Sequence, residues 1–353
     1  MAEGIIGGVK ISELGEFELI ARIKQELGGQ EKAKAALGRH SHLLIGIGDD
    51  AAAWQSANVA HIATTDTLVA GVHFPAEGVA WADLGWKALA VNVSDIAAMG
   101  GIPEYALVTL ALPGDFPVED VIAFYRGMAA LGREFGVVIA GGDLVRAAQA
   151  AATVAIWGRA SEDPRGEPIF LTRGAAHAGD AIAVSGSLGN AAGGLRLLTE
   201  ARAVSRTVAD YLRRAHLRPR PQVELGRALL RAGIRCAIDI SDGLARDLRH
   251  ICEESRLGAV VHAERLPVSE QLRKTFPDEA VEMAVSGGED YELLFTGPVD
   301  LIDRVRARFA QPITVIGEMV EDGEGGVRFL DDADREMTFE SAGWDHFAGE
   351  GRA

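Results

Sequence analysis

The sequence predicts a protein of the α/β (α+β) class that is built from two domains. Segments with strand-like and helix-like spacing alternate along both halves of the chain, as they do in proteins that layer helices on sheets. The chain has 353 residues, more than the roughly 250–300 at which a single hydrophobic core stops growing. A stretch with proline and glycine, EDPRGEP (162–168), separates the halves, and we expect the domain boundary there.

Hydrophobic spacing and turn residues predict the elements of the first half. Residues 16–27 place Phe17, Ile20 and Ile23 at helical spacing, and Gly136 is typical of a helix end. The expected elements are a helix at 16–27, a short strand opening 43–52, strands at 59–69, 105–113, 137–143 and 152–160, and helices at 81–99 and 118–136. We expect a flexible leader at 1–15 and a first domain at 16–161.

The same signals return after the boundary. The expected strands of the second half are 180–186, 236–241, 258–263, 291–296 and 312–318, and the expected helices are 190–201, 222–232, 243–255 and 299–309. These predict a second α/β domain over 169–347 and a tail at 348–353.

The composition excludes several classes of protein. Asp and Glu outnumber Lys and Arg by 51 to 35, so a net charge of −16 argues against nucleic-acid or anionic-membrane partners. No uncharged apolar run approaches the roughly 18 residues of a membrane helix, and the N-terminus lacks the pattern of a signal peptide. Cys236 and Cys252 are far apart and in no metal or redox spacing, which favours the cytoplasm.

The acidic residues recur in glycine- or hydroxyl-rich turns. One such turn is ordinary loop chemistry, but five of them, each beside an apolar strand, indicate a site. Carboxylate oxygens suit Mg²⁺, which proteins hold with a few carboxylates plus water and substrate phosphates. The turns are GIGDDAA (46–52), TTDT (64–67), AGGDLV (140–145), DISDG (239–243) and SGGEDYE (286–292).

Asp95 extends this pattern onto a helix. Leu84, Ala88 and Val91 form the inward stripe of the helix predicted over 81–99, and Asp95 is the next position on that stripe. A carboxylate on a buried stripe needs a metal or a partner. A salt bridge to Lys87 or Arg126 is the alternative to a metal.

Other known nucleotide-binding and metal-binding motifs fit the sequence less well than a magnesium site. GIGDDA (46–51) follows a strand and Asp66 lies 20 residues beyond Gly46, as in a dinucleotide fingerprint, but Asp49 and Asp50 would repel a pyrophosphate there. The sequence has no Walker A motif, zinc motif or protein-kinase signature. Phosphate chemistry through several Mg²⁺ ions remains, in a phosphotransferase or a multi-metal phosphatase. A non-catalytic nucleotide- or metal-binding module also stays open.

Seven segments follow one another along the chain: GIGDDAA, TTDTLVAGVHF, KALAVNVSDIAAMGG, GGD, SGSLGNAAGG, IDISDGL and SGGEDYELLFT. Taken in this order, they resemble the thiamine-monophosphate kinases of the aminoimidazole ribonucleotide synthetase-like ATP-binding superfamily. The resemblance covers roughly residues 16–347, and its kinase-specific parts are the second and the last of these segments.

The resemblance implies ATP-dependent phosphorylation of thiamine phosphate to thiamine diphosphate, with ATP as co-substrate and several Mg²⁺ ions. It also implies a two-domain synthetase-like fold whose N-terminal sheet pairs across a homodimer. The metal ligands that it implies are Asp50, Thr64, Thr65, Asp66, Asp95, Asp143, Asp239 and Asp242, among which Asp66 and Asp95 are taken as essential for catalysis. It implies ATP contacts by Gly142, Asp143, Arg173 and Ser241, and thiamine phosphate contacts by His73, Glu289 and Trp344.

Simpler roles stay open for some of these residues. His73 could be a loop histidine, Arg173 a surface charge and Trp344 an anchor for the tail. Thr64 and Thr65 alternate across a strand, so both can bind metal only if one uses its backbone carbonyl. Arg146 is a further phosphate-binding candidate. Leu144 stands where the family often has threonine.

We expect direct in-line transfer of the γ-phosphoryl group without a general base, because a phosphate monoester is already ionised at pH 7. Other ATP-dependent synthetases of the superfamily are less consistent with the sequence. A selenophosphate synthetase would need a reactive residue near the N-terminus, whereas the first cysteine is Cys236, and a hydrogenase maturation factor would end in cysteine. The purine-pathway synthetase does not predict SGGEDYEL.

Overall fold

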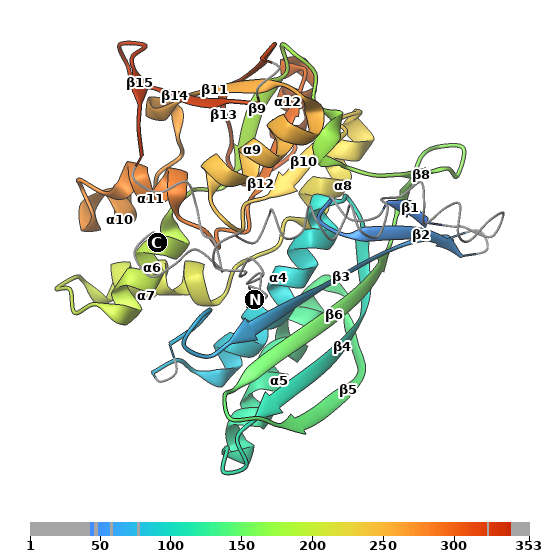
Figure 1. Ribbon diagram of the computed structural model, residues 1–353, viewed down its shortest axis with the longest axis vertical. Coiled ribbons are helices and arrows are strands. Elements are labelled where there is room, and N and C mark those ends of the chain that lie inside the picture. Colours follow the sequence, from blue (N-terminus) through green and yellow to red (C-terminus); the bar gives the residue numbers. More distant parts are fainter. Residues whose placement is uncertain (1–42, 46–48, 57–58, 76–77, 323–324, 340–353) are drawn as a thin grey trace, which may run out of the picture.

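The computed structural model describes residues 43–45, 49–56, 59–75, 78–322 and 325–339 (Figure 1). Two β-sheets with helices packed on them confirm the predicted fold class. The predicted helix at 16–27, the leader 1–15, the tail 348–353 and Trp344 lie outside the described residues.

The first sheet has six strands in the order β1-β2-β3-β6-β4-β5. Every neighbouring pair in it is antiparallel except β4 and β5, which are parallel. In β6 buried and less buried residues alternate, as the two-residue period of a strand requires when one face is covered. The strands are β1 (Leu43–Ile45), β2 (Ala52–Ser56), β3 (Val59–Val69), β4 (Ile102–Leu112), β5 (Val138–Arg146) and β6 (Ala151–Arg159).

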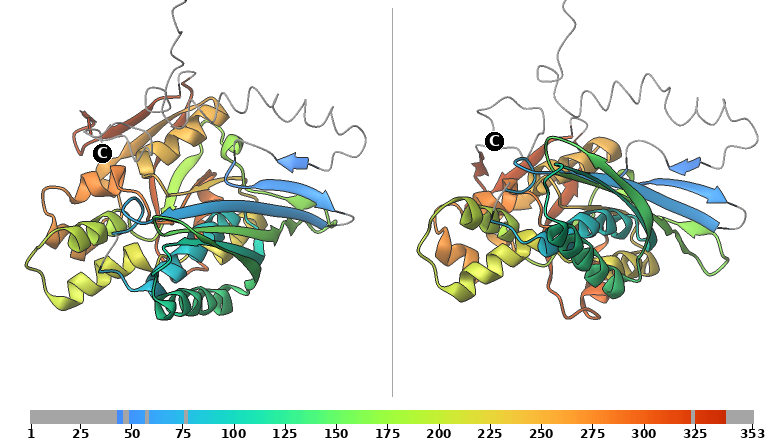
Figure 2. Two further views of the ribbon diagram at one scale, coloured as in Figure 1. Left: turned by 60° about the horizontal axis from the view of Figure 1, so that its bottom comes forward. Right: turned by 90° about the horizontal axis from the view of Figure 1, so that it is seen from below.

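Helices α4 (Trp81–Ala98) and α5 (Val118–Phe135) cover one face of this sheet (Figures 1 and 2). They cross closely, because a Cβ atom on Gly85 of α4 would come within 1.8 Å of the carbonyl oxygen of Phe124 of α5. Almost all of α4 is buried, including the predicted stripe of Leu84, Ala88 and Val91. The helix is therefore enclosed by both domains and does not lie on the surface.

The second sheet has seven strands in the order β10-β12-β9-β13-β11-β14-β15, and only β11 and β14 are parallel. This mostly antiparallel pairing makes α+β the better of the two class descriptions. The strands are β9 (Ala181–Ser185), β10 (Cys236–Asp239), β11 (Gly258–His262), β12 (Leu293–Gly297), β13 (Ile313–Val320), β14 (Val327–Leu330) and β15 (Glu336–Met337). Two short strands, β7 (Ser161–Glu162) and β8 (Pro168–Ile169), pair across the predicted boundary.

Some helices of this half pack on the second sheet, and the others form a group of their own to one side of it (Figure 1). They are α6 (Asn190–Thr199), α7 (Arg206–Leu217), α8 (Val223–Ala232), α9 (Leu244–Ser255), α10 (Glu270–Thr275), α11 (Ala280–Ser286) and α12 (Val299–Arg306). Two single 3₁₀ turns, η2 (Arg173–Ala175) and η3 (Ala263–Arg265), complete the set. Within the described segments, every helix is too short or too polar to cross a lipid bilayer.

The two halves meet along α4. The indole Nε1 of Trp86 donates to the carbonyl oxygen of Pro219 at 2.8 Å. The backbone N–H of Leu171 donates to the carbonyl oxygen of Met99 at 3.1 Å. A Cβ atom on Gly226 of α8 would lie 2.1 Å from the carbonyl oxygen of Ala97. Such close backbone contact joins the halves into one packed unit, while the domain limits at 161 and 169 remain our prediction.

Candidate functional site

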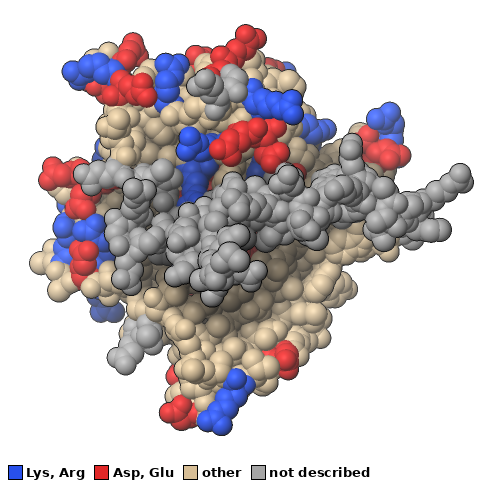
Figure 3. Space-filling view, viewed as in Figure 1, with Lys and Arg blue, Asp and Glu red and all other residues tan. Residues whose placement is uncertain are grey.

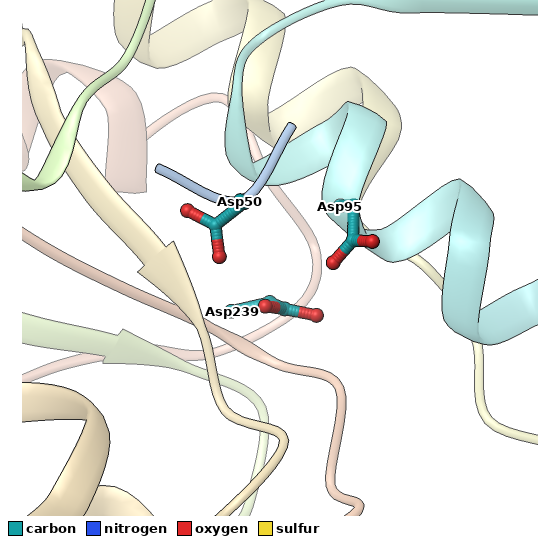
Figure 4. Close-up of side chains that lie close together, drawn as sticks. All are labelled: Asp50, Asp95 and Asp239. Carbon is teal, nitrogen blue, oxygen red and sulfur yellow. The ribbon is translucent and has the colours of Figure 1, made fainter. Parts of the chain in front are cut away.

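Three carboxylates from distant parts of the chain meet where the two halves join (Figure 4). Asp50 lies in the turn before β2, Asp95 lies on α4, and Asp239 is the last residue of β10. One oxygen from each lies within 4.8 Å of the others. We call these three residues the carboxylate cluster. The structure thus brings together three residues that the sequence predicted to share a metal site.

Neighbouring side chains fix each member of the cluster. The Ser94 hydroxyl donates to Asp239 Oδ2 at 2.6 Å, and the Thr64 hydroxyl donates to Asp95 Oδ2 at 2.7 Å. The guanidinium of Arg173 forms a two-pronged pair with Asp50, with contacts of 2.8 and 3.3 Å. These bonds hold the carboxylates in place although the groups repel one another.

The cluster carries more negative charge than its surroundings neutralise. Burial, and then the charges of Asp66 and Asp239, raise the pKa of Asp95 well above its usual range. Burial and the charge of Asp50 raise the pKa of Asp239 in the same way. A divalent cation would relieve this repulsion, and the ligands on offer are carboxylate and hydroxyl oxygens, which suit Mg²⁺. The residues therefore fit the predicted metal.

Asp247 holds the acidic turn 239–243 from behind. It is only 2 % exposed, and its Oδ2 accepts three backbone N–H groups, from Ser241 at 3.1 Å, Asp242 at 3.2 Å and Gly243 at 3.1 Å. Burial, followed by the charge of Asp242, raises the pKa of Asp247 well above its usual range. Asp247 thereby fixes the backbone beside two predicted metal ligands.

The acidic turn 286–292 lies against the turn 239–243. The backbone N–H of Glu289 donates to the carbonyl oxygen of Ser241 at 2.7 Å, and that of Tyr291 donates to Ile240 at 2.9 Å. A Cβ atom on Gly288 would lie 2.4 Å from the same oxygen of Ser241, so only glycine fits there. The two turns are therefore a single unit at the junction of the halves.

Lys87 and His216 form a buried ionic set with the Glu289 side chain. Lys87 Nζ lies 2.7 Å from Glu289 Oε1, and His216 Nδ1 lies 3.1 Å from Oε2. Burial alone would raise the pKa of Glu289, but Lys87 and then the neighbouring His216 lower it to about 2. Burial and the charge of Lys87 lower the pKa of His216. The alternative partners of Asp95 are thus wrong, because Lys87 pairs with Glu289 and Arg126 is exposed on α5.

The predicted metal ligands Asp66, Thr65 and Asp242 lie outside the carboxylate cluster. Asp66 lies within β3, opposite Val154 of β6. The Thr65 hydroxyl donates to the backbone oxygen of Val154, away from Asp95, so Thr65 could reach a shared metal only through its carbonyl. Asp242 is partly buried, with Arg246 Nε 3.9 Å from its Oδ2.

Gly142 and Asp143 are not brought to the carboxylate cluster. They are exposed on β5, and the order β3-β6-β4-β5 separates them from Asp66 by three strand spacings, or about 14 Å along the sheet. Arg146, at the end of the same strand, is exposed as well. His73 lies in the turn after β3, where its Nδ1 accepts the backbone N–H of Val69 at 3.1 Å.

Four site residues escaped prediction from the sequence. Ser94 and Asp49 adjoin predicted ligands, and Asp49 accepts the backbone N–H of Arg173 at 2.9 Å. Asp247 follows the turn 239–243 by one helical turn, the only signal it gave. His216 carried no motif, since its helix α7 was not predicted.

Comparison with known proteins places the fold in a class. Residues 48–160 match the family model for "AIR synthase related protein, N-terminal domain", and residues 177–329 match that for the C-terminal domain. The protein is thus a two-domain member of the AIR synthase-related class, with a carboxylate cluster between its domains.

Full-length relatives define the family within this class. The thiamine-monophosphate kinase of Escherichia coli K12 is 40% identical over 342 residues, covering 95% of this chain and 98% of the relative. That of Bacillus subtilis is 38% identical, covering 87% and 95%. A solved structure described as AaThiL complexed with AMPPCP and TMP matches with a TM-score of 0.82 and 31% identity, over 96% of this chain and 99% of the other. The chain therefore belongs to the thiamine-monophosphate kinase family.

Proposed function

We propose that this protein phosphorylates thiamine phosphate with ATP to give thiamine diphosphate. The carboxylate cluster is the observation that carries the proposal, because three carboxylates within 4.8 Å at a domain junction suit the metal-assisted handling of phosphates. Family membership supplies the substrate, and a relative solved with AMPPCP and TMP supports it.

Asp50, Asp95 and Asp239, together with Thr64 and Asp66, would hold Mg²⁺ in the active protein. Bound there, Mg²⁺ would neutralise charge on the transferred phosphoryl group and bring two anionic phosphates together. Asp242, at the rim of the site, is an additional ligand in this proposal.

Arg173 would bind the phosphates of ATP. Its side chain is 20% exposed, so the guanidinium is at the edge of the cluster and can offer N–H groups to a ligand while it holds Asp50. A planar fork of donors matches phosphate oxygens. Ser241, which adjoins Asp242 in the turn that Asp247 holds, would add a hydroxyl contact to ATP.

The acceptor needs no general base. The phosphate monoester of the substrate is already mostly ionised at pH 7, since its second pKa is about 6. The task of the residues is therefore to hold donor and acceptor in line and to exclude water. Glu289 and His73 are assigned to thiamine phosphate, and so is Trp344.

We further propose that two copies associate through the open β5 edge of the first sheet and the uncovered sheet face beside it. Exposed apolar side chains gather on β4 and β5: Tyr105, Leu107, Val138, Leu144 and Val145. In Figure 3 the lower part of the molecule, where this sheet lies, carries few Lys, Arg, Asp or Glu residues. Such an edge is a ready surface for a second copy. Asp143 would then face a second copy. In this proposal, it acts as a metal ligand through that contact.

The protein would work in the cytoplasm, which agrees with its two buried free cysteines. The decisive assay supplies ATP, Mg²⁺ and thiamine phosphate and follows thiamine diphosphate by chromatography. We expect product that depends on all three components. Phosphate release without thiamine phosphate would instead indicate a phosphatase, and ATP–Mg²⁺ binding without any product would indicate a binding module.

A further inference from the structure

The buried ionic set joins Lys87 of α4, His216 of α7 and Glu289 of the turn 286–292. Lys87 and His216 are both 0% exposed, whereas the Glu289 side chain is 24% exposed. Glu289 is therefore the one member of the set that a ligand can touch. Lys87 and His216 lie behind it and hold both of its carboxylate oxygens.

A buried charge of this kind needs a reason beyond stability. Removing Lys87 and Glu289 from water costs free energy that their attraction only partly repays, and an apolar pair of similar size is often as stable or more stable. The backbone of Glu289 is also strained, with φ at +68° in the left-handed region that disfavours side chains. A charged side chain kept in a strained turn is typical of a functional position.

The position of Lys87 on α4 relates the set to the carboxylate cluster. Asp95 follows Lys87 by eight residues on one continuous helix, which corresponds to about 12 Å of rise. Glu289 also adjoins the turn 239–243 through its backbone bond to Ser241. The Glu289 carboxylate and the cluster thus lie at two ends of one region, where they can bind different parts of one extended small molecule.

The chemistry of thiamine phosphate matches these two ends. Its phosphate belongs at the metal-binding cluster, and the rest of the molecule is a heterocyclic system whose positively charged thiazolium ring attracts a fixed carboxylate. We propose that Lys87 and His216 are positioning residues that orient the Glu289 carboxylate for the cationic heterocyclic end of thiamine phosphate. This inference rests on the proposed function and adds two residues that select its acceptor substrate.

Lys87 acts only through Glu289, because it is fully buried and cannot reach a ligand. Its ammonium lies 2.7 Å from one carboxylate oxygen of Glu289, and His216 Nδ1 lies 3.1 Å from the other. Lys87 Nζ also lies 3.3 Å from His216 Nε2, so the two residues support each other. Without Lys87 the carboxylate can rotate towards solvent and is no longer held in the orientation that receives the substrate. The loss should appear in the binding of thiamine phosphate and leave the binding of ATP unchanged.

The test compares Lys87→Met with the matched control Lys274→Met, which removes an exposed lysine paired with Glu270 on α10. Steady-state kinetics should give a KM for thiamine phosphate about tenfold or more above wild type, with the KM for ATP within about twofold. Calorimetric titration of thiamine phosphate into the protein without ATP should weaken by the same factor. The control should match wild type in all three measurements.

A double variant separates positioning from general damage. If Lys87 acts through Glu289, then Lys87→Met should add little to the KM of a Glu289→Gln protein, so the two effects should not add. His216→Gln provides a second route if Lys87→Met fails to fold, because it keeps the ion pair. We expect it to raise the same KM severalfold.

Two results would overturn the inference. One is a KM for thiamine phosphate that stays at the wild-type value in the folded Lys87→Met or His216→Gln protein. The other is a rise in the KM of both substrates by the same factor, which a merely structural role would produce. Turnover by the wild-type protein is measured first, so failure of the proposed function is seen before any variant is compared.

Discussion

Replacing Asp95 by asparagine should abolish catalysis and, at the same time, stabilise the metal-free fold. Asparagine has almost the same shape as aspartate, and its carbonyl oxygen can still accept the hydroxyl of Thr64, now 2.7 Å from the carboxylate. The substitution therefore removes one negative charge and little else. It separates the electrostatic role of Asp95 from its packing.

The cost to metal binding follows from the charge that is lost. At an effective dielectric constant of about 20, a unit charge at about 4 Å from another contributes about 4 kcal/mol, and more for a divalent ion. Allowing for rearrangement of the remaining ligands, we expect a loss of at least about 3 kcal/mol in Mg²⁺ affinity, which is more than a hundredfold. Turnover at millimolar Mg²⁺ should fall by a similar or larger factor.

The stability effect has the opposite sign. Asp95 lies within 4.8 Å of both Asp50 and Asp239, a distance at which each fully ionised pair repels by about 3 kcal/mol at the same dielectric constant. Partial protonation and the pairing of Asp50 with Arg173 reduce this, so we expect a gain of about 1–3 kcal/mol. The melting temperature of the metal-free protein should rise by about 2–6 °C.

Both effects are measured on one preparation treated with a chelator. Thermal denaturation gives the stability, calorimetric titration with Mg²⁺ gives the affinity, and the chromatographic assay of thiamine diphosphate gives turnover. Asp278→Asn, at an exposed position, should change none of them. Full activity of Asp95→Asn, or a melting temperature below that of wild type, would refute our account of the cluster.

Three further variants test other parts of the structure. Ser94→Ala removes the 2.6 Å bond to Asp239, and the Mg²⁺ concentration for half-maximal activity should rise about tenfold to a hundredfold with little change in melting temperature. Glu292→Gln should flatten the pH dependence of stability, because burial raises the pKa of Glu292 to about 8. The wild-type protein should therefore lose about 2–4 kcal/mol of unfolding free energy as the pH rises from about 4.5 through 8. Denaturation of both proteins at pH 5 and pH 9 measures the difference. Tyr105→Arg, at a side chain 53% exposed on β4, should yield a folded monomer by light scattering, and a dimer that persists would contradict the proposed contact.

Hydrophobic period and turn chemistry predicted most of the elements. The strand predicted at 59–69 is β3 with the same limits, and the helix predicted at 118–136 ends at Gly136, whose φ is +75°. Helix α7 was missed although it is amphipathic, because its buried face carries only Ala209, Leu212, His216 and Leu217 in a segment rich in arginine. The short helices α10 and α11 were missed too, since six or seven residues give too few turns for a period to emerge.

The sequence was less informative about how the site is held together. It marked Asp50, Asp95 and Asp239 by their turns and by one helical stripe, and the structure joins those three. It gave no sign that Asp143 would lie three strands from Asp66, because strand order is a long-range property. Lys87, offered by the sequence as an alternative partner of Asp95, pairs with Glu289 instead, because packing brings that acid beside α4.

The sequence by itself determined the fold class, the residues able to bind metal and the family, because these depend on residue type and on local spacing. The tertiary structure alone decided which acids form a cluster, which are neutralised by Arg173 or Lys87, and which remain exposed. The physical reason is that charge interactions depend on distance and burial. Asp95 and Asp239 are 144 residues apart in the chain, and only the packing of α4 against β10 brings their oxygens within 4.8 Å.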